Sequence, residues 1–124
     1  MNNHIETEKI KEVIRNYSEG TFEADAAKLE KAFHPNAVMN GFLGGEMLIA
    51  TPKAFIEDMV SNPSMASENS PYNLEIESIR IEGDIADVII SQTGFRGSTS
   101  FVDCFHMIKA DGEWKIISKL FTTL

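Results

Sequence analysis

Apolar residues in the first part of the chain recur at the spacing of an α-helix. One stripe at positions i, i+3, i+4 and i+7 consists of Ile10, Val13, Ile14 and Tyr17. This stripe predicts an amphipathic helix from about residue 3. Gly20 is typical of a helix C-terminus, so we expect the helix to end there.

Two shorter helices are expected after the first one. Asp25 is a suitable N-cap for a short helix, which Pro35 prevents from continuing. Thr51 and Pro52 have the residue types of an N-cap and a first helical position, and they predict a third helix of about ten residues. Residues 36–49 between these helices are apolar and rich in glycine, which favours one or two short, bent strands.

The second half of the chain changes to the two-residue period of β-strands. A polar loop at residues 61–71 comes first, and apolar residues then alternate with polar ones. The phase of this alternation reverses between Ile76 and Ile79, which predicts a bulge and a curved strand. Further turns are expected at Gly83-Asp84, Arg96-Gly97-Ser98 and Ala110-Asp111-Gly112. Three helices and an antiparallel meander define the fold class as α+β.

Composition narrows the possible functions. The 124 residues are the size of one domain, which we place at residues 1–124. Eleven basic and 19 acidic residues give a net charge of −8, so we expect no nucleic acid and no membrane surface among the partners. Cys104 is the single cysteine, and no spacing suggests a metal site, a cofactor or a disulfide. The sequence starts without a leader pattern, which favours a cytoplasmic protein.

Several short motifs together resemble the nuclear transport factor 2-like superfamily. They are similar most of all to the members labelled putative lumazine-binding, near the polyketide cyclase-like branch. The motifs are Tyr17…Glu19-Gly20, Phe33-His34-Pro35-Asn36-Ala37, Thr51-Pro52, Phe101-Val102-Asp103-Cys104-Phe105 and Asp111-Gly112-Glu113-Trp114-Lys115-Ile116. The resemblance implies a cystatin-like cone, in which three helices pack in the concave face of a strongly curved, mainly antiparallel sheet. It also implies an apolar pocket and a homodimer formed through the outer face of the sheet.

The last hairpin carries the candidate chemistry. If Ala110-Asp111-Gly112 is a three-residue loop, Lys109 faces Glu113, and Asp103 faces Lys119 on the same side as Phe105 and Phe121. By the resemblance, this side faces the pocket. Trp114, Ile116 and His106 then lie on the outer side, and Ile117 and Lys115 on the inner side. A two-residue loop would shift the register and cancel the pairing.

The predicted site combines polar groups with apolar lining residues. The expected ligand-binding residues are Tyr17, Phe22, His34, Phe42, Phe55, Met59, Asp103, Phe105, Lys119 and Phe121. Lys119 can present its charge to a carbonyl or carboxylate of a ligand while Asp103 orients it, or the two can form a structural ion pair. Tyr17 is either a hydrogen-bond donor to a ligand oxygen or a core residue, and His34 is either a pocket residue or a helix-end histidine.

Three functions remain open at this point. The first is binding of a small, flat, mostly apolar or aromatic ligand. The alternative is a cofactor-independent dehydratase, isomerase or cyclase, with Asp103 and His34 as the catalytic acid or base. The isomerase-like relatives carry a carboxylate base on the strand after the second helix, whereas residues 38–42 contain none. The third is an interaction module whose cavity is filled by its own side chains.

Overall fold

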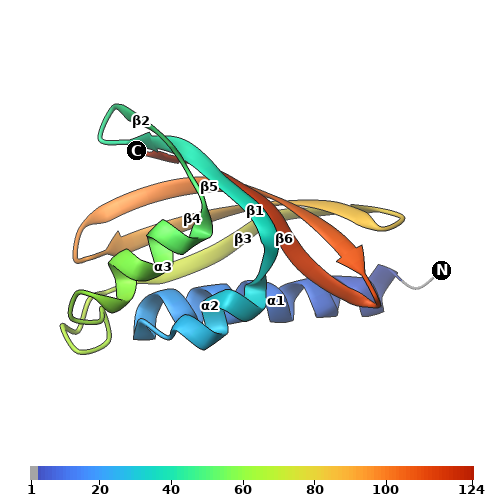
Figure 1. The fold of residues 1–124 in the computed structure, drawn as a ribbon, viewed down its shortest axis with the longest axis horizontal. Coiled ribbons are helices and arrows are strands. Elements are labelled where there is room, and N and C mark those ends of the chain that lie inside the picture. The colour runs from blue at the N-terminus through green and yellow to red at the C-terminus, as the bar shows by residue number, and fades with distance from the viewer. Residues whose placement is uncertain (1–2) are drawn as a thin grey trace.

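The computed structural model describes residues 3–124 and places three helices against one curved sheet (Figure 1). The elements are α1 (Asn3–Glu23), α2 (Ala26–Ala32), β1 (Phe33–Leu43), β2 (Glu46–Ala50), α3 (Pro52–Val60), β3 (Asn73–Glu82), β4 (Ile85–Phe95), β5 (Thr99–Ala110) and β6 (Glu113–Thr123). The strand order is β2-β1-β6-β5-β4-β3; β1 and β6 run parallel, and the other neighbouring pairs run antiparallel. The predicted α+β class is confirmed.

One of the irregularities that favour a curved sheet lies where the sequence pattern predicts it. The pairing of β3 with β4 shifts register between Ile76 and Ser78, which confirms the bulge. The core lies between the concave face of the sheet and the helices, where Ile14 and Tyr17 of α1 cluster with Leu29 of α2 and Phe105 of β5. Within residues 3–124, no helix combines the length and apolar character needed to cross a membrane.

The prediction that the first helix ends at Gly20 is wrong. α1 continues to Glu23, and Ala24 then adopts a left-handed φ of 56° before Asp25 caps α2 by accepting a hydrogen bond from Lys28 N. Gly20 instead lies where the two helices meet. A Cβ at this position would stand 2.7 Å from Leu29 Cγ, so the glycine allows close packing of α2 on α1.

The loop between β5 and β6 has two residues, so the expected three-residue loop is wrong. Asp111 and Gly112 both have positive φ, 52° and 78°, as a type I′ turn requires, and this turn matches the twist of the flanking strands. Lys109 therefore pairs with Trp114 instead of Glu113. Trp114, expected on the outer side, is buried in the core together with Ile116.

A bulge in β6 returns the rest of the hairpin to the expected phase. Met107 pairs with Ile116 but His106 pairs with Ser118, so Ile117 is an extra residue, and it lines an outer groove with His106. Beyond the bulge, Asp103 pairs with Phe121 and Phe105 pairs with Lys119. Asp103 and Lys119 are thus diagonal neighbours on the inner face instead of direct partners.

Candidate functional site

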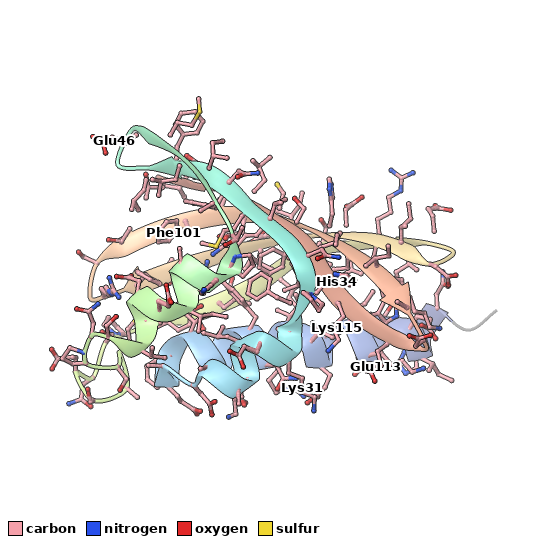
Figure 2. The ribbon with its side chains drawn as sticks, viewed as in Figure 1. Lys31, His34, Glu46, Phe101, Glu113 and Lys115 are labelled. Atoms are coloured by element: carbon pink, nitrogen blue, oxygen red, sulfur yellow. The ribbon has the colours of Figure 1, made fainter. Side chains whose placement is uncertain are left out.

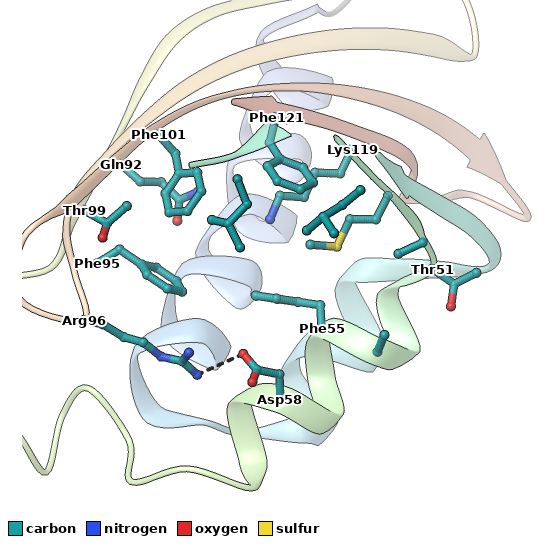
Figure 3. Close-up of a pocket in the computed structure, with 15 residues that line it drawn as sticks. Thr51, Phe55, Asp58, Gln92, Phe95, Arg96, Thr99, Phe101, Lys119 and Phe121 are labelled. Atoms are coloured by element: carbon teal, nitrogen blue, oxygen red, sulfur yellow. Dashed lines mark ion pairs between the residues drawn. The ribbon is translucent and has the colours of Figure 1, made fainter. Parts of the chain in front are cut away.

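A pocket of about 540 Å³ opens between the β1–β2 hairpin, α3 and the adjoining ends of β4, β5 and β6 (Figure 3). Most of its lining is apolar. The lining residues are Met39, Leu43, Leu48, Ala50, Thr51, Ala54, Phe55, Asp58, Gln92, Phe95, Arg96, Thr99, Phe101, Lys119 and Phe121. A cavity of this size and character suits a small, mostly apolar molecule.

The ammonium group of Lys119 lies on the inner wall of this pocket, surrounded by aromatic rings. Only 5% of the Lys119 side chain is exposed. Its Nζ lies 4.5 Å from the ring centre of Phe55 and 5.3 Å from that of Phe121. Burial lowers the pKa of Lys119, and the nearby carboxylate of Asp103 opposes this effect. The ring faces and Asp103 therefore replace part of the hydration that the ammonium loses.

Two polar groups hold Lys119 from the side of the core. Nζ donates a hydrogen bond of 2.7 Å to the Tyr17 hydroxyl and lies 3.4 Å from Asp103 Oδ2. Burial, and then the charge of Asp103, raise the pKa of Tyr17, so its phenol keeps its proton. An ammonium has three N–H donors. The Tyr17 hydroxyl accepts a hydrogen bond from one of them, and Asp103 faces the ammonium as its ion-pair partner. At least one donor is therefore left for an acceptor in the pocket.

Asp103 belongs to a buried chain of hydrogen bonds. It is fully buried, and its Oδ1 accepts a hydrogen bond of 2.9 Å from Gln92 Nε2. The Gln92 side-chain oxygen in turn accepts a hydrogen bond from the Tyr72 hydroxyl. Within residues 3–124, Asp103 Oδ2 has no hydrogen-bond partner, and Lys119 is the charge that faces it. The chain fixes the carboxylate, which in turn positions the ammonium.

An ion pair at the edge of the pocket joins α3 to the β4–β5 turn. Arg96 Nη2 lies 3.0 Å from Asp58 Oδ2, as the dashed line in Figure 3 shows. The Arg96 guanidinium also lies 5.6 Å from the ring centre of Phe95. Both charged side chains are partly exposed, so the pair marks the side of the pocket that faces solvent.

The structure brings only part of the predicted site together. Phe55, Lys119 and Phe121 line the pocket. Tyr17, Asp103 and Phe105 lie behind it in the core, where Tyr17 and Phe105 pack edge to face at 5.1 Å. The polar atoms of Tyr17 and Asp103 lie against the ammonium group of Lys119.

Four predicted residues lie away from the pocket lining. Phe22 stacks on Tyr72, and Met59 is buried with its sulfur 3.7 Å from Arg96 Nη2. Phe42 is 44% exposed because successive residues of β1 face opposite sides of the sheet, with Met39 and Gly41 buried and Phe42 on the outer face. His34 is the second residue of β1, close to the end of α2 and apart from Phe101 in Figure 2, and its Nδ1 accepts a hydrogen bond from Asn36 N.

Several lining residues are missing from the sequence prediction. The sequence pattern could have identified Gln92, because it is a polar residue that follows Val88 and Ile90 in the inward phase of β4. The same alternation could have identified Phe101, which shares the inward phase of Asp103 in β5. No local pattern could have identified Arg96 and Asp58, because their ion pair joins a turn and a helix that are far apart in the sequence.

Fold and site together define a cone-shaped α+β domain with an apolar pocket and a buried lysine. The chain belongs to the family described as putative lumazine-binding, whose model matches residues 5–122. No curated protein matches the chain.

Solved structures of the nuclear transport factor 2-like superfamily share the fold. A protein of unknown function from Shewanella baltica is 26% identical, with a TM-score of 0.86 over 100% of this chain and 98% of that one. One from Silicibacter pomeroyi, also of unknown function, is 22% identical, with a TM-score of 0.88 over 100% of both chains. A putative ketosteroid isomerase from Shewanella frigidimarina is 20% identical, with a TM-score of 0.64 over 92% and 94%.

Proposed function

We propose that this protein binds a small, flat, mostly apolar molecule that carries one negatively charged or hydrogen-bond-accepting group. The observation that supports it is the Lys119 ammonium, which lies on the wall of an apolar pocket of about 540 Å³ with at least one donor free. Phe55 and Phe121 provide ring faces next to Nζ in the pocket lining, and Nζ provides the polar contact. In a site shielded from water, a charge-assisted hydrogen bond is stronger than at the surface.

The family description agrees with this ligand class. Lumazine is a flat, bicyclic ring compound with carbonyl oxygens, so it combines the ring faces and the acceptor that the pocket suits. We therefore propose the class of flat molecules with an acceptor, of which lumazine is one member.

A general acid or base enzyme has less support in the geometry. Asp103 lies behind Lys119, and His34 lies outside the pocket lining. Asp58 is the carboxylate among the lining residues, and Arg96 holds it at 3.0 Å. A carboxylate in an ion pair is a weak base. We therefore give ligand binding precedence over the dehydratase, isomerase or cyclase alternative.

Two dyes that differ in one charged group test the proposal. 8-Anilinonaphthalene-1-sulfonate carries a sulfonate, and N-phenyl-1-naphthylamine is the same molecule without it. We expect the wild-type protein to bind the sulfonated dye at least about tenfold more tightly, which is about 1.4 kcal/mol. Lys119→Met removes this preference, and Lys115→Met, which removes a charge from the same strand outside the pocket, keeps it.

Fluorescence titration with both dyes gives the two dissociation constants. Asp103→Asn/Lys119→Met serves as a second variant without a net buried charge, should Lys119→Met fail to fold. Equal affinities of the wild-type protein for the two dyes, or an unchanged preference in the folded variants, contradict the proposal.

We also propose that two copies of the chain associate through the outer face of the sheet. Apolar side chains gather there on neighbouring strands, and each of them is at least 42% exposed; they are Val38, Phe42, Met47, Ile49 and Leu120. A contiguous apolar surface is costly to leave in water. We expect light scattering after size-exclusion chromatography to give about twice 13.8 kDa, and Leu120→Lys to give the monomer. A wild-type monomer at high protein concentration refutes this interface.

A further inference from the structure

Lys119 is placed differently from the other lysines whose ion pairs the structure shows. Its side chain is 5% exposed, whereas that of Lys115, on the same strand, is 24% exposed and lies 3.7 Å from Glu113 Oε1. Lys119 lies on the pocket wall, and a phenol, a carboxylate and aromatic rings surround its Nζ. An amine in an apolar pocket beside groups that exchange protons is the arrangement that carbonyl-condensing lysines require.

We propose that Lys119 acts as an amine nucleophile toward an aldehyde or ketone group on an apolar ligand and forms an imine with it. This inference rests on the proposed function, because the ligand must enter the same pocket. It narrows the ligand class from molecules with an acceptor oxygen to molecules with a reactive carbonyl carbon.

Asp103 and Tyr17 can carry the proton transfers that addition of Lys119 to a carbonyl group requires. Nζ gives a proton to Asp103 Oδ2, 3.4 Å away, and its free electron pair then forms a bond to the carbonyl carbon. The electrons of the C=O bond move to the carbonyl oxygen. This oxygen takes the proton of the Tyr17 hydroxyl, and the Tyr17 oxygen takes a proton from Nζ, 2.7 Å away. The product of this step is a neutral carbinolamine, and Asp103 still holds its proton.

Loss of water completes the imine. The proton held by Asp103 returns, through nitrogen and the Tyr17 hydroxyl, to the carbinolamine oxygen, which leaves as water while nitrogen forms the C=N bond. Overall, an ammonium and a carbonyl give a protonated imine and water, so the positive charge stays beside Asp103. Because the buried carboxylate is paired before and after the reaction, the step creates no new unpaired charge in the core.

Two further properties of the site favour the reaction. Burial lowers the pKa of Lys119, so a larger fraction of this amine is neutral at pH 7 than of an exposed lysine. The apolar lining also disfavours retention of the released water. Both effects act on Lys119 and leave the exposed lysines unaffected.

Reductive trapping tests the inference on the wild-type chain. The protein is incubated at pH 7 with 2-naphthaldehyde and sodium cyanoborohydride, which reduces an imine to a stable secondary amine, and peptide mass spectrometry locates the label. We expect the labelling rate at Lys119 to saturate with aldehyde concentration and to exceed that at Lys115 by about tenfold or more. 2-Naphthalenemethanol, which has the same rings and no carbonyl, should compete with this labelling.

The labelling and binding results distinguish a failure of imine formation from a failure of ligand binding in the pocket. Reversible binding of both naphthalene compounds in the pocket, with labelling at Lys119 no faster than at Lys115, overturns the imine and leaves the proposed function standing. Binding of neither compound, together with no preference for the sulfonated dye, overturns both. Labelling at Lys119 that starts to rise at lower pH than labelling at Lys115 supports the inference, because a merely structural lysine shows no such profile.

Discussion

Replacement of Lys119 by methionine should destabilise the protein by several kcal/mol. Methionine retains apolar contact with Phe55 and Phe121, but it leaves the fully buried carboxylate of Asp103 without an opposite charge. Loss of one partner from a buried ion pair costs about 3–5 kcal/mol. This loss is a large part of the roughly 5–15 kcal/mol that stabilises a typical domain.

Two other variants separate this effect from a general loss of charge. Lys115→Met removes a partly exposed ammonium that lies near Glu113, and we expect it to cost at most about 1 kcal/mol. Asp103→Asn/Lys119→Met removes both charges and keeps an oxygen that can accept the hydrogen bond from Gln92. It should therefore be more stable than Lys119→Met alone.

Equilibrium unfolding in urea measures all three differences. The single tryptophan, Trp114, is buried, so its fluorescence reports the loss of the core. A cost below about 1 kcal/mol for Lys119→Met would contradict this prediction, because the buried carboxylate would then not depend on Lys119. A double variant no more stable than Lys119→Met would refute it equally.

Three further predictions concern the sheet, acid pH and alkaline pH. A Cβ at Gly41 would overlap the Phe121 carbonyl oxygen and lie 2.8 Å from Phe121 Cδ1, so Gly41→Ala should cost about 1–3 kcal/mol in urea unfolding; wild-type stability would contradict this. Hydrogen bonds from Lys109 and Trp114 lower the pKa of Glu6 in the folded protein below the usual 4.5. Its contribution to the unfolding free energy is therefore fully present above pH 4.5 and is lost as the pH falls through the lowered pKa of the folded state. The deficit of Glu6→Gln in unfolding free energy should therefore shrink below pH 4.5, and a constant deficit would disprove it. Burial raises the pKa of Tyr72, so above pH 10 this hydroxyl ionises in the unfolded state and stays protonated in the folded protein. Tyr72→Phe should lower the unfolding free energy by about 1 kcal/mol at pH 7, because it loses the hydrogen bond to Gln92, and this difference from the wild-type protein should narrow above pH 10. A difference that widens above pH 10 would contradict the raised pKa.

Local features of the fold were predictable from the sequence, whereas the register of the last hairpin was not. The Asp25 cap and the bulge after Ile76 depend on neighbouring residues, so patterns within a few positions indicate them. The β5–β6 turn depends on Asp111 adopting a left-handed φ, and the bulge at Ile117 depends on core packing that buries Trp114 and returns Lys119 to the inner face. The two deviations compensate, so Asp103 and Lys119 meet although the predicted pairing was wrong.

The pocket itself was less predictable than its charged pair. Alternation in β5 and β6 identifies which residues share the inner face, and Phe121 follows from it. Phe42 was misplaced because alternation alone does not say which face of β1 turns inward. The Arg96–Asp58 pair arises where a turn approaches α3, and this proximity depends on the whole fold.

A crystal structure of the protein with 8-anilinonaphthalene-1-sulfonate would show whether Lys119 binds the charged group of a ligand inside the pocket. We expect a sulfonate oxygen about 3 Å from Lys119 Nζ and the naphthalene rings against Phe55 and Phe121. Dye bound on the outer face of the sheet over Phe42 and Leu120, with the pocket free of dye, would contradict it.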